Sequence, residues 1–333
     1  MLFQSLWLLV GLGLLLVAGD ILVRGAVSAA LRMGVSPLVA GIVVIGFGTS
    51  LPEILVSVDA ALANAEDLAH GNIVGSNIAN MMLVLAATAL FAPIHTNLNG
   101  ITRAMSATVL ATIAWIGLTF YVGLNPVIGA AFLLAISGYV WFTIASNRTA
   151  SAGEVEIDPE VEEVAKQHMP AWKFIAFILI GLIGLALGAR LTINAGVAIA
   201  RELNVSEAVI GLTLLAVGTS LPEIGASVAA AIRKHADVVI GNVIGSNLFN
   251  ILAAGGAVAL IKTQTLSNDF HGYSHLVMAA ATALVAIFVF NRWNVGRVTG
   301  IVLLVGYLLY VIGLVNGANI SDLLQDDSTG RVI

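Results

Sequence analysis

"IGFGTSLPEILVS", residues 45–57, places polar side chains inside a stretch that is otherwise apolar. Pro52 lacks a backbone N–H and disfavours helical geometry at the residue before it, so a helix should break there. Ser50, Pro52 and Glu53 also follow the order of a helical N-terminus, with serine as the N-cap and glutamate three positions later. The stretch therefore predicts a discontinuous helix that restarts near Ser50.

The composition is that of a membrane protein. Of the 333 residues, 59% are hydrophobic and only 10% are charged, and the mean hydropathy is +1.00. Soluble domains have about 45–50% apolar and about 25% charged residues. The chain has no cysteine, which excludes disulfides and thiolate chemistry.

Apolar runs of about 20 residues, long enough to cross a bilayer as helices, occur ten times. The first run has no basic segment before it and no small-residue cleavage site, so we interpret it as a membrane span and not as a signal peptide. The sequence thus predicts an all-α polytopic protein with ten transmembrane helices. The expected spans are 3–23, 36–63, 68–91, 104–122, 125–145, 173–195, 206–232, 237–261, 274–291 and 298–316.

The opening stretch belongs to an internal repeat. "GTSLPE" occurs at 48–53 and again at 218–223, and "GNIVGSNIAN" at 71–80 returns as "GNVIGSNLFN" at 241–250, always with an offset of 170 residues. Each copy holds five spans, and an odd number makes the second copy enter the membrane from the opposite face. Inverted repeats of this kind are typical of secondary transporters, with the binding site at the midplane between the copies.

The repeat divides the chain into two halves and a linker. The linker is acidic and too short to fold as a domain. The expected parts are a first five-helix repeat at 1–145 with its motifs at 46–80, a linker at 146–172, and a second five-helix repeat at 173–333 with its motifs at 216–250.

Lys and Arg predict the orientation, because they concentrate on the cytoplasmic side. If the N-terminus is outside, ten of the fourteen lie on the side of the linker. The other side then has Arg190, Arg201, Lys262 and Arg331. We therefore expect an integral membrane protein with a cytoplasmic linker and both termini outside.

Glu53 is expected deep in the membrane. It follows Pro37 by sixteen residues, or about 24 Å of helix, in an apolar core about 30 Å thick. A charge at that depth costs at least ~2.5 kcal/mol, whereas a helix cap contributes only about 1 kcal/mol. A buried carboxylate that recurs as Glu223 therefore indicates a function beyond capping.

The other polar groups of the motifs are oxygen donors. Thr49 lies one turn from Glu53, and Ser76 and Asn80 share a helix face, as do their counterparts in the second copy. The break should also free carbonyl oxygens near Gly46. Neither motif has a histidine or cysteine, so the set suits Ca²⁺ and Na⁺ and argues against zinc or copper.

The paired motifs resemble the α-repeats of the cation/calcium exchanger superfamily, above all its prokaryotic sodium/calcium antiporters. The resemblance covers the whole chain and implies ten helices around a diamond-shaped cluster of ion sites. It also implies Ca²⁺ and Na⁺ as transported substrates, without a cofactor, and asparagine at position 250 resembles potassium-independent members. The ion ligands that it implies are Thr49, Ser50, Glu53, Ser76, Asn80, Thr219, Ser220, Glu223, Ser246 and Asn250.

Other functions remain open on the sequence alone. The nearest alternative to Ca²⁺/Na⁺ antiport is Ca²⁺/H⁺ antiport, with Glu53 and Glu223 as proton carriers. A passive cation channel is disfavoured by the inverted repeat, which suits alternating access. The motifs contain no evident nucleophile, metal-binding histidine or basic residue that would orient a substrate, so we do not expect an enzyme. The expected partners are the two ions and the lipid bilayer, with no nucleic acid and no obligate protein partner.

Overall fold

The computed structural model describes residues 2–150, 170–203, 216–263 and 271–328, and in these ranges the chain is almost entirely helical. Most of the expected linker and the start of the span at 206–232 lie outside the described residues. The helices are α1 (Leu2–Met33), α2 (Pro37–Val39), η1 (Ala40–Ile45), α3 (Gly46–Thr49), α4 (Leu51–Leu62), α5 (Glu66–Ala79), η2 (Asn80–Val84), α6 (Leu85–Phe91), α7 (Ile101–Tyr121), α8 (Pro126–Ala150), α10 (Ala171–Glu202), α12 (Ala216–Thr219), α13 (Leu221–Ile232), α14 (Ala236–Leu248), η4 (Phe249–Ala254), α15 (Gly255–Ile261), α16 (His271–Phe290) and α17 (Arg297–Ser328).

The polytopic all-α fold is confirmed. Eight of the described helices are long and apolar enough to cross a membrane, and Pro37–Thr49 with Leu51–Leu62 forms a further span that is bent by 41°. The remaining expected span, 206–232, keeps α12 and α13 within the described residues, but its first part lies outside them. The break predicted from Pro52 is present, because the chain turns at Ser50 between α3 and α4.

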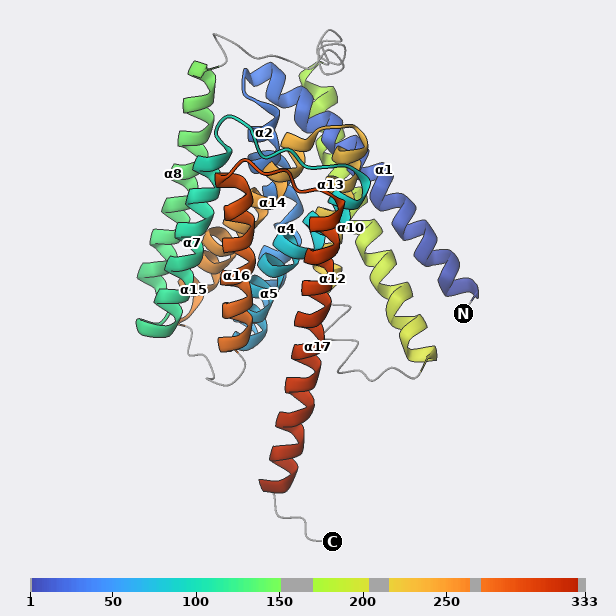
Figure 1. Cartoon of the computed structure of the whole chain (residues 1–333), viewed down its shortest axis with the longest axis vertical. Coiled ribbons are helices and arrows are strands. Elements are labelled where there is room, and N and C mark those ends of the chain that lie inside the picture. The colour runs from blue at the N-terminus through green and yellow to red at the C-terminus, as the bar shows by residue number, and fades with distance from the viewer. Residues whose placement is uncertain (1, 151–169, 204–215, 264–270, 329–333) are drawn as a thin grey trace.

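The helices that carry the second motif form the centre of the molecule. The spans Glu66–Phe91 and Ala236–Ile261 are 78% buried over their most apolar stretch, whereas the other long spans are 22–39% buried. In Figure 1, α7, α8 and α16 lie on one side of this centre, and α1 and α10 lie on the other. Small residues make the central packing possible, since a Cβ on Gly41 would lie 2.6 Å from the Val238 carbonyl oxygen.

The first helices of the two halves run antiparallel along each other. A Cβ on Gly11 would lie 2.8 Å from the backbone N of Thr192, and one on Gly25 would lie 2.9 Å from that of Ile178. Early residues of α1 thus meet late residues of α10, and late residues of α1 meet early ones. This is the arrangement that an inverted repeat predicts.

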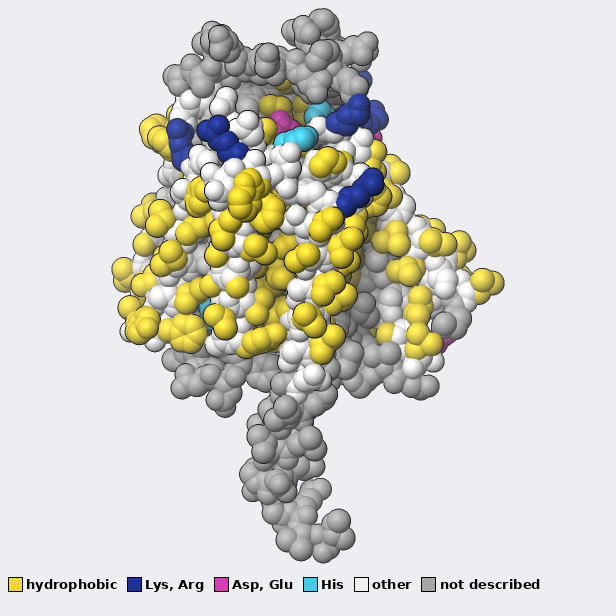
Figure 2. Space-filling view, viewed as in Figure 1, with side chains coloured by type: hydrophobic (Ala, Val, Ile, Leu, Met, Phe, Trp, Pro, Cys, Tyr) yellow, Lys and Arg dark blue, Asp and Glu magenta, His cyan; other side chains and the backbone are white. Residues whose placement is uncertain are grey.

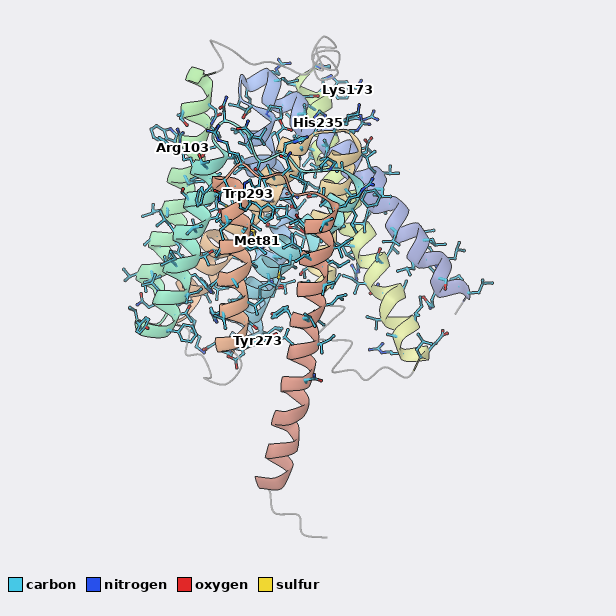
Figure 3. The ribbon with its side chains drawn as sticks, viewed as in Figure 1. Met81, Arg103, Lys173, His235, Tyr273 and Trp293 are labelled. Carbon is cyan, nitrogen blue, oxygen red and sulfur yellow. The ribbon has the colours of Figure 1, made fainter. Side chains whose placement is uncertain are left out.

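Basic side chains are unevenly distributed along the face of the molecule that Figure 2 shows. We call the end where α8 finishes and α10 begins the linker end; the first residue of α1 and the last turns of α17 lie toward the opposite end (Figure 1). Lys and Arg side chains on the face in Figure 2 gather toward the linker end, above a wide apolar band. Arg103 and Lys173 lie at that end, whereas Tyr273 lies near the other (Figure 3).

Candidate cation-binding site

The helix break has the same backbone geometry in both copies. Ser50 has φ −81° and ψ −1°, and Ser220 has φ −85° and ψ 4°. Neither serine makes a side-chain capping hydrogen bond, so the predicted N-cap role of Ser50 is wrong. An N-cap residue normally has extended geometry, whereas Ser50 stays near-helical and its carbonyl accepts the Ile54 N–H at 3.0 Å. The hydroxyl is thereby released for another contact.

That contact crosses to the second copy. The Ser50 hydroxyl donates to Oε1 of Glu223 at 3.4 Å. The Glu223 carboxylate is fully buried, and its other oxygen, Oε2, has no hydrogen-bond partner among the described residues. The carboxylate of one repeat therefore lies against the helix break of the other.

Oxygen atoms crowd together around Thr49. Its hydroxyl donates to the Ile45 carbonyl at 2.9 Å, and it lies 3.3 Å from Oδ1 of Asn242 and 3.4 Å from the Ser246 hydroxyl. A hydroxyl has only one hydrogen to donate, so most of these oxygens turn lone pairs toward one another. A cation would stabilise such a cluster.

The carbonyl of Gly46 does not match the expectation from sequence. We expected it to be free, but it accepts the Ser50 N–H at 3.2 Å and the Ser246 hydroxyl at 3.3 Å. The reason is that Ser50 remains near-helical and keeps its N–H directed toward Gly46, four residues earlier. Pro52 has no backbone N–H, so the carbonyl that loses its helical donor is that of Gly48, four residues before Pro52.

The half of the site around Glu53 has fewer internal contacts. Glu53 is 1% exposed, and neither of its carboxylate oxygens has a hydrogen-bond partner in the described part of the chain. The buried hydroxyls of Thr219 and Ser220 also have no hydrogen-bond partner among the described residues. A buried carboxylate without a partner is strongly unfavourable, and a bound cation is the partner that would offset this cost.

The two asparagines of the second motif complete the polar set. Asn80 and Asn250 are fully buried, and their amide groups have no hydrogen-bond partner among the residues that the structure describes. Both lie in π-helical segments, η2 and η4, which the sequence did not predict. Such segments often occur at functional sites. Ser76 is also buried, one turn before Asn80 on α5.

Helix packing brings these residues into one region. Helix α5 packs against α12, α4 packs against η4, and α13 packs against η2. Direct side-chain contacts across the two copies join Thr49 to Ser246 and Ser50 to Glu223. The chemistry of the region is two carboxylates with neutral hydroxyl and amide oxygens. The described ranges contain no group of three or more His, Cys, Asp or Glu that could hold a metal ion. A donor set made of oxygen atoms favours a hard cation.

Asn72 and Asn242 fasten the two motif helices of each copy together. Nδ2 of Asn72 donates to the Glu53 carbonyl at 3.1 Å and to the Ser57 hydroxyl at 2.9 Å. Asn242 makes the same bonds to Glu223, at 3.5 Å, and to Ser227, at 2.9 Å. The sequence analysis left Asn242 out of the site, yet its Oδ1 also faces Thr49. Its place nineteen residues after the glutamate in both copies was the available signal.

Replacing Asn242 with alanine should weaken calcium binding more than replacing Asn72. Both changes remove the bonds that hold a glutamate-bearing helix, and a lost buried hydrogen bond costs about 1–3 kcal/mol. Asn242→Ala also removes an oxygen next to Thr49, so we expect its half-saturating calcium concentration to rise about tenfold or more. Asn291→Ala is the matched control, because that amide is exposed just past the end of α16 and donates to the Ile287 carbonyl, outside both motifs. An unchanged calcium dependence in Asn242→Ala would contradict this role.

Comparison with known proteins agrees with the architecture. The family model described as sodium/calcium exchanger protein matches residues 3–145 and 173–316. The inner membrane protein YrbG of Escherichia coli is 30% identical over 315 residues, which cover 93% of this chain and 96% of YrbG. The sodium/calcium exchanger MaX1 of Methanosarcina acetivorans is 27% identical over 339 residues, which cover 92% of this chain and 97% of MaX1.

Solved structures show the same relationship. The sodium-calcium exchanger NCX_Mj superposes with a TM-score of 0.79 at 31% identity, and the alignment covers 94% of this chain and 99% of that one. The family model spans far more than half of the sequence and includes both copies of the two motifs. The chain is therefore a membrane protein of the sodium/calcium exchanger family.

Proposed function

We propose that the protein is a secondary antiporter that exchanges Ca²⁺ for Na⁺ by alternating access. The observation that carries the proposal is the site itself. Two buried carboxylates, one from each repeat, lie among hydroxyl and amide oxygens at two helix breaks. Membership of an exchanger family supports cation/Ca²⁺ exchange, and the related MaX1 is named a sodium/calcium exchanger.

The ligands that we propose are those expected from the two motifs. Glu53 and Glu223 supply the negative charge that a divalent cation requires, and the neutral groups supply the remaining oxygens. All ten belong to the four motif segments and are buried or partly buried. They are Thr49, Ser50, Glu53, Ser76, Asn80, Thr219, Ser220, Glu223, Ser246 and Asn250.

The neutral oxygens favour sodium over protons as the driving ion. A proton carrier needs only groups that titrate, and the two glutamates would suffice. The duplicated Thr, Ser and Asn side chains instead offer oxygens that can replace the water shell of several monovalent ions. With asparagine and not a third carboxylate at position 250, we also propose exchange that does not require potassium.

We further propose that the repeats occupy residues 1–145 and 173–333 and that both termini lie outside. The gathering of Lys and Arg toward the linker end in Figure 2 supports a cytoplasmic linker, because basic residues concentrate on that side. The membrane would then be a prokaryotic plasma membrane, which agrees with the name of the related inner membrane protein.

Purified protein in liposomes provides the test of the driving ion. With pH clamped on both sides, an outward sodium gradient should drive calcium into the liposomes. If more than two Na⁺ leave for each Ca²⁺ that enters, net positive charge moves outward, so an inside-positive potential should accelerate uptake. Calcium flux is followed with a tracer.

Three other outcomes would contradict the proposal in different ways. Uptake that needs a pH gradient, ignores sodium and ignores the potential would identify Ca²⁺/H⁺ antiport. Calcium that runs down its own gradient with no counter-ion would identify a channel. Uptake that requires potassium together with sodium would reject the potassium-independent form of exchange.

A further inference from the structure

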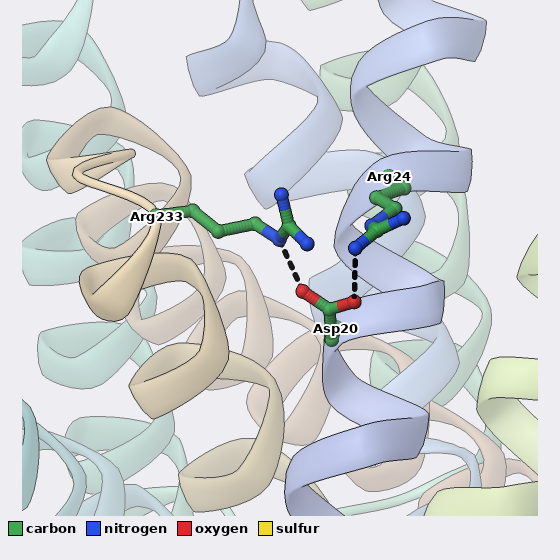
Figure 4. Close-up of polar contacts among 3 residues, drawn as sticks. All are labelled: Asp20, Arg24 and Arg233. Atoms are coloured by element: carbon green, nitrogen blue, oxygen red, sulfur yellow. Dashed lines mark hydrogen bonds and ion pairs between the residues drawn. The ribbon is translucent and has the colours of Figure 1, made fainter.

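One of the two equivalent helix interfaces in this structure is closed. Helix α1 covers α13 at the linker end: a Cβ on Gly19 would lie 2.8 Å from the carbonyl carbon of Gly225. Near this contact, Asp20 forms ion pairs with Arg24, at 3.0 Å, and with Arg233, just past the end of α13 (Figure 4). The sequence predicts only the pair with Arg24, because Arg233 is distant in the chain.

The offset of 170 residues relates this interface to a second one between α10 and α4. Gly225 corresponds to Leu55 and Ala229 to Asp59. Gly225 is buried and Ala229 is only 4% exposed, whereas Leu55 is 60% exposed and Asp59 is exposed. The α13 face is thus covered and the equivalent α4 face is not.

The charges at the two interfaces are reversed. Asp20 of α1 corresponds to Arg190 of α10. Arg233, which follows α13, corresponds to Ala63, which follows α4 and has no charge. Asp59 lies four residues before Ala63, about one helical turn earlier and on the same face of α4. An acid on α1 thus faces a base on the α13 side, and a base on α10 has a matching acid on α4. Neither Asp59 nor Arg190 takes part in the ion pairs between described residues.

We propose that Arg190 and Asp59 form an ion pair in the alternate state of the transport cycle, when α10 covers α4 and the bond between Asp20 and Arg233 is open. The inference rests on the alternating access proposed above, in which two inverted copies exchange their conformations. It assigns a role to Asp59, which has no charged counterpart in the second copy, where Ala229 stands. Each state then has one ion pair across its closed helix interface, and the two pairs lie at opposite ends of the membrane.

The pair should balance the two states and not lock one of them. Asp20 and Arg233 keep 30% of their side-chain surface exposed, and exposed ion pairs shift an equilibrium by about fivefold at most. Losing one pair should therefore change the ratio of the two states by about two- to fivefold.

Cysteine cross-linking tests the proposal directly, because the chain has no cysteine of its own. Leu55 and Ala189 are the counterparts of Gly225 and Gly19, so Leu55→Cys with Ala189→Cys should form a disulfide only in the alternate state. The purified protein in liposomes is treated with copper phenanthroline, and the cross-linked fraction is measured. Calcium transport by each single-cysteine variant shows that the fold is intact.

Charge variants made in the protein with Leu55→Cys and Ala189→Cys should change the cross-linked fraction in opposite directions. Asp59→Asn or Arg190→Gln should lower the cross-linked fraction about two- to fivefold. Asp20→Asn is the matched control and should raise it, since it removes the competing pair. Exchanging the charges, with Asp59→Arg and Arg190→Asp together, should restore the fraction that either reversal alone lowers.

Two results would overturn the proposal: an unchanged fraction in Asp59→Asn and Arg190→Gln, or no cross-link in a variant that transports calcium. Failure of the exchange proposal has a different signature. If the charge variants change the cross-linked fraction as predicted but calcium uptake depends on a proton gradient, sodium is rejected as the driving ion and the proposed ion pair is retained.

Discussion

Glu53→Gln and Glu223→Gln should each reduce calcium transport by at least about 100-fold. Each change removes one of the two negative charges that would face a divalent cation. At about 4 Å, a single pair of unit charges is worth roughly 4 kcal/mol even at an effective dielectric constant of 20, and each 1.4 kcal/mol corresponds to about tenfold in affinity. Tracer calcium uptake into liposomes under a sodium gradient measures the effect.

Folding should survive both changes, because a buried neutral amide is less costly than a buried carboxylate. Elution as a single species in detergent and an unchanged melting temperature would show this. Glu66→Gln is the matched control, since Glu66 pairs with Lys262 outside the site at 2.7 Å. Near-normal uptake by either purified site variant would remove that glutamate from the proposed ligands.

Gly245→Val should prevent the centre of the molecule from assembling. A Cβ at Gly245 would lie 2.7 Å from Cα and 2.9 Å from the carbonyl carbon of Ile42, so the obstacle is backbone and cannot rotate away. Overpacking costs about 1–3 kcal/mol where side chains can adjust, and we expect more here. The folded yield after detergent extraction should fall severalfold, and the melting temperature of any remaining protein should drop by about 5 °C or more.

Gly138→Val provides the control for valine in a transmembrane helix. Gly138 is exposed on α8, and a Cβ there would meet no described atom within 4 Å. If Gly245→Val is as stable as Gly138→Val, close approach of η1 and α14 is not required for the fold. The contact matters for function as well, because η1 leads directly into Thr49 and α14 carries Ser246.

The sequence by itself determined the membrane class, the inverted repeat and the helix break at Ser50. Each of these depends on local chemistry. An apolar run of about 20 residues is long enough to cross a bilayer whatever surrounds it, and Pro52 removes a backbone donor in any context. The fixed offset of 170 residues also located both carboxylates, Glu53 and Glu223, before any contact was known.

Only the tertiary structure decided which groups meet across that offset. The Ser50 hydroxyl could have capped its own helix, but it bonds to Glu223 because the second copy approaches the break from the other side. The ion pair between Asp20 and Arg233 and the uncovered face around Asp59 likewise depend on how α1 and α10 are placed between the repeats. A repeat encodes two equivalent interfaces, and the packing in this structure closes the one between α1 and α13 and leaves the equivalent face of α4 uncovered.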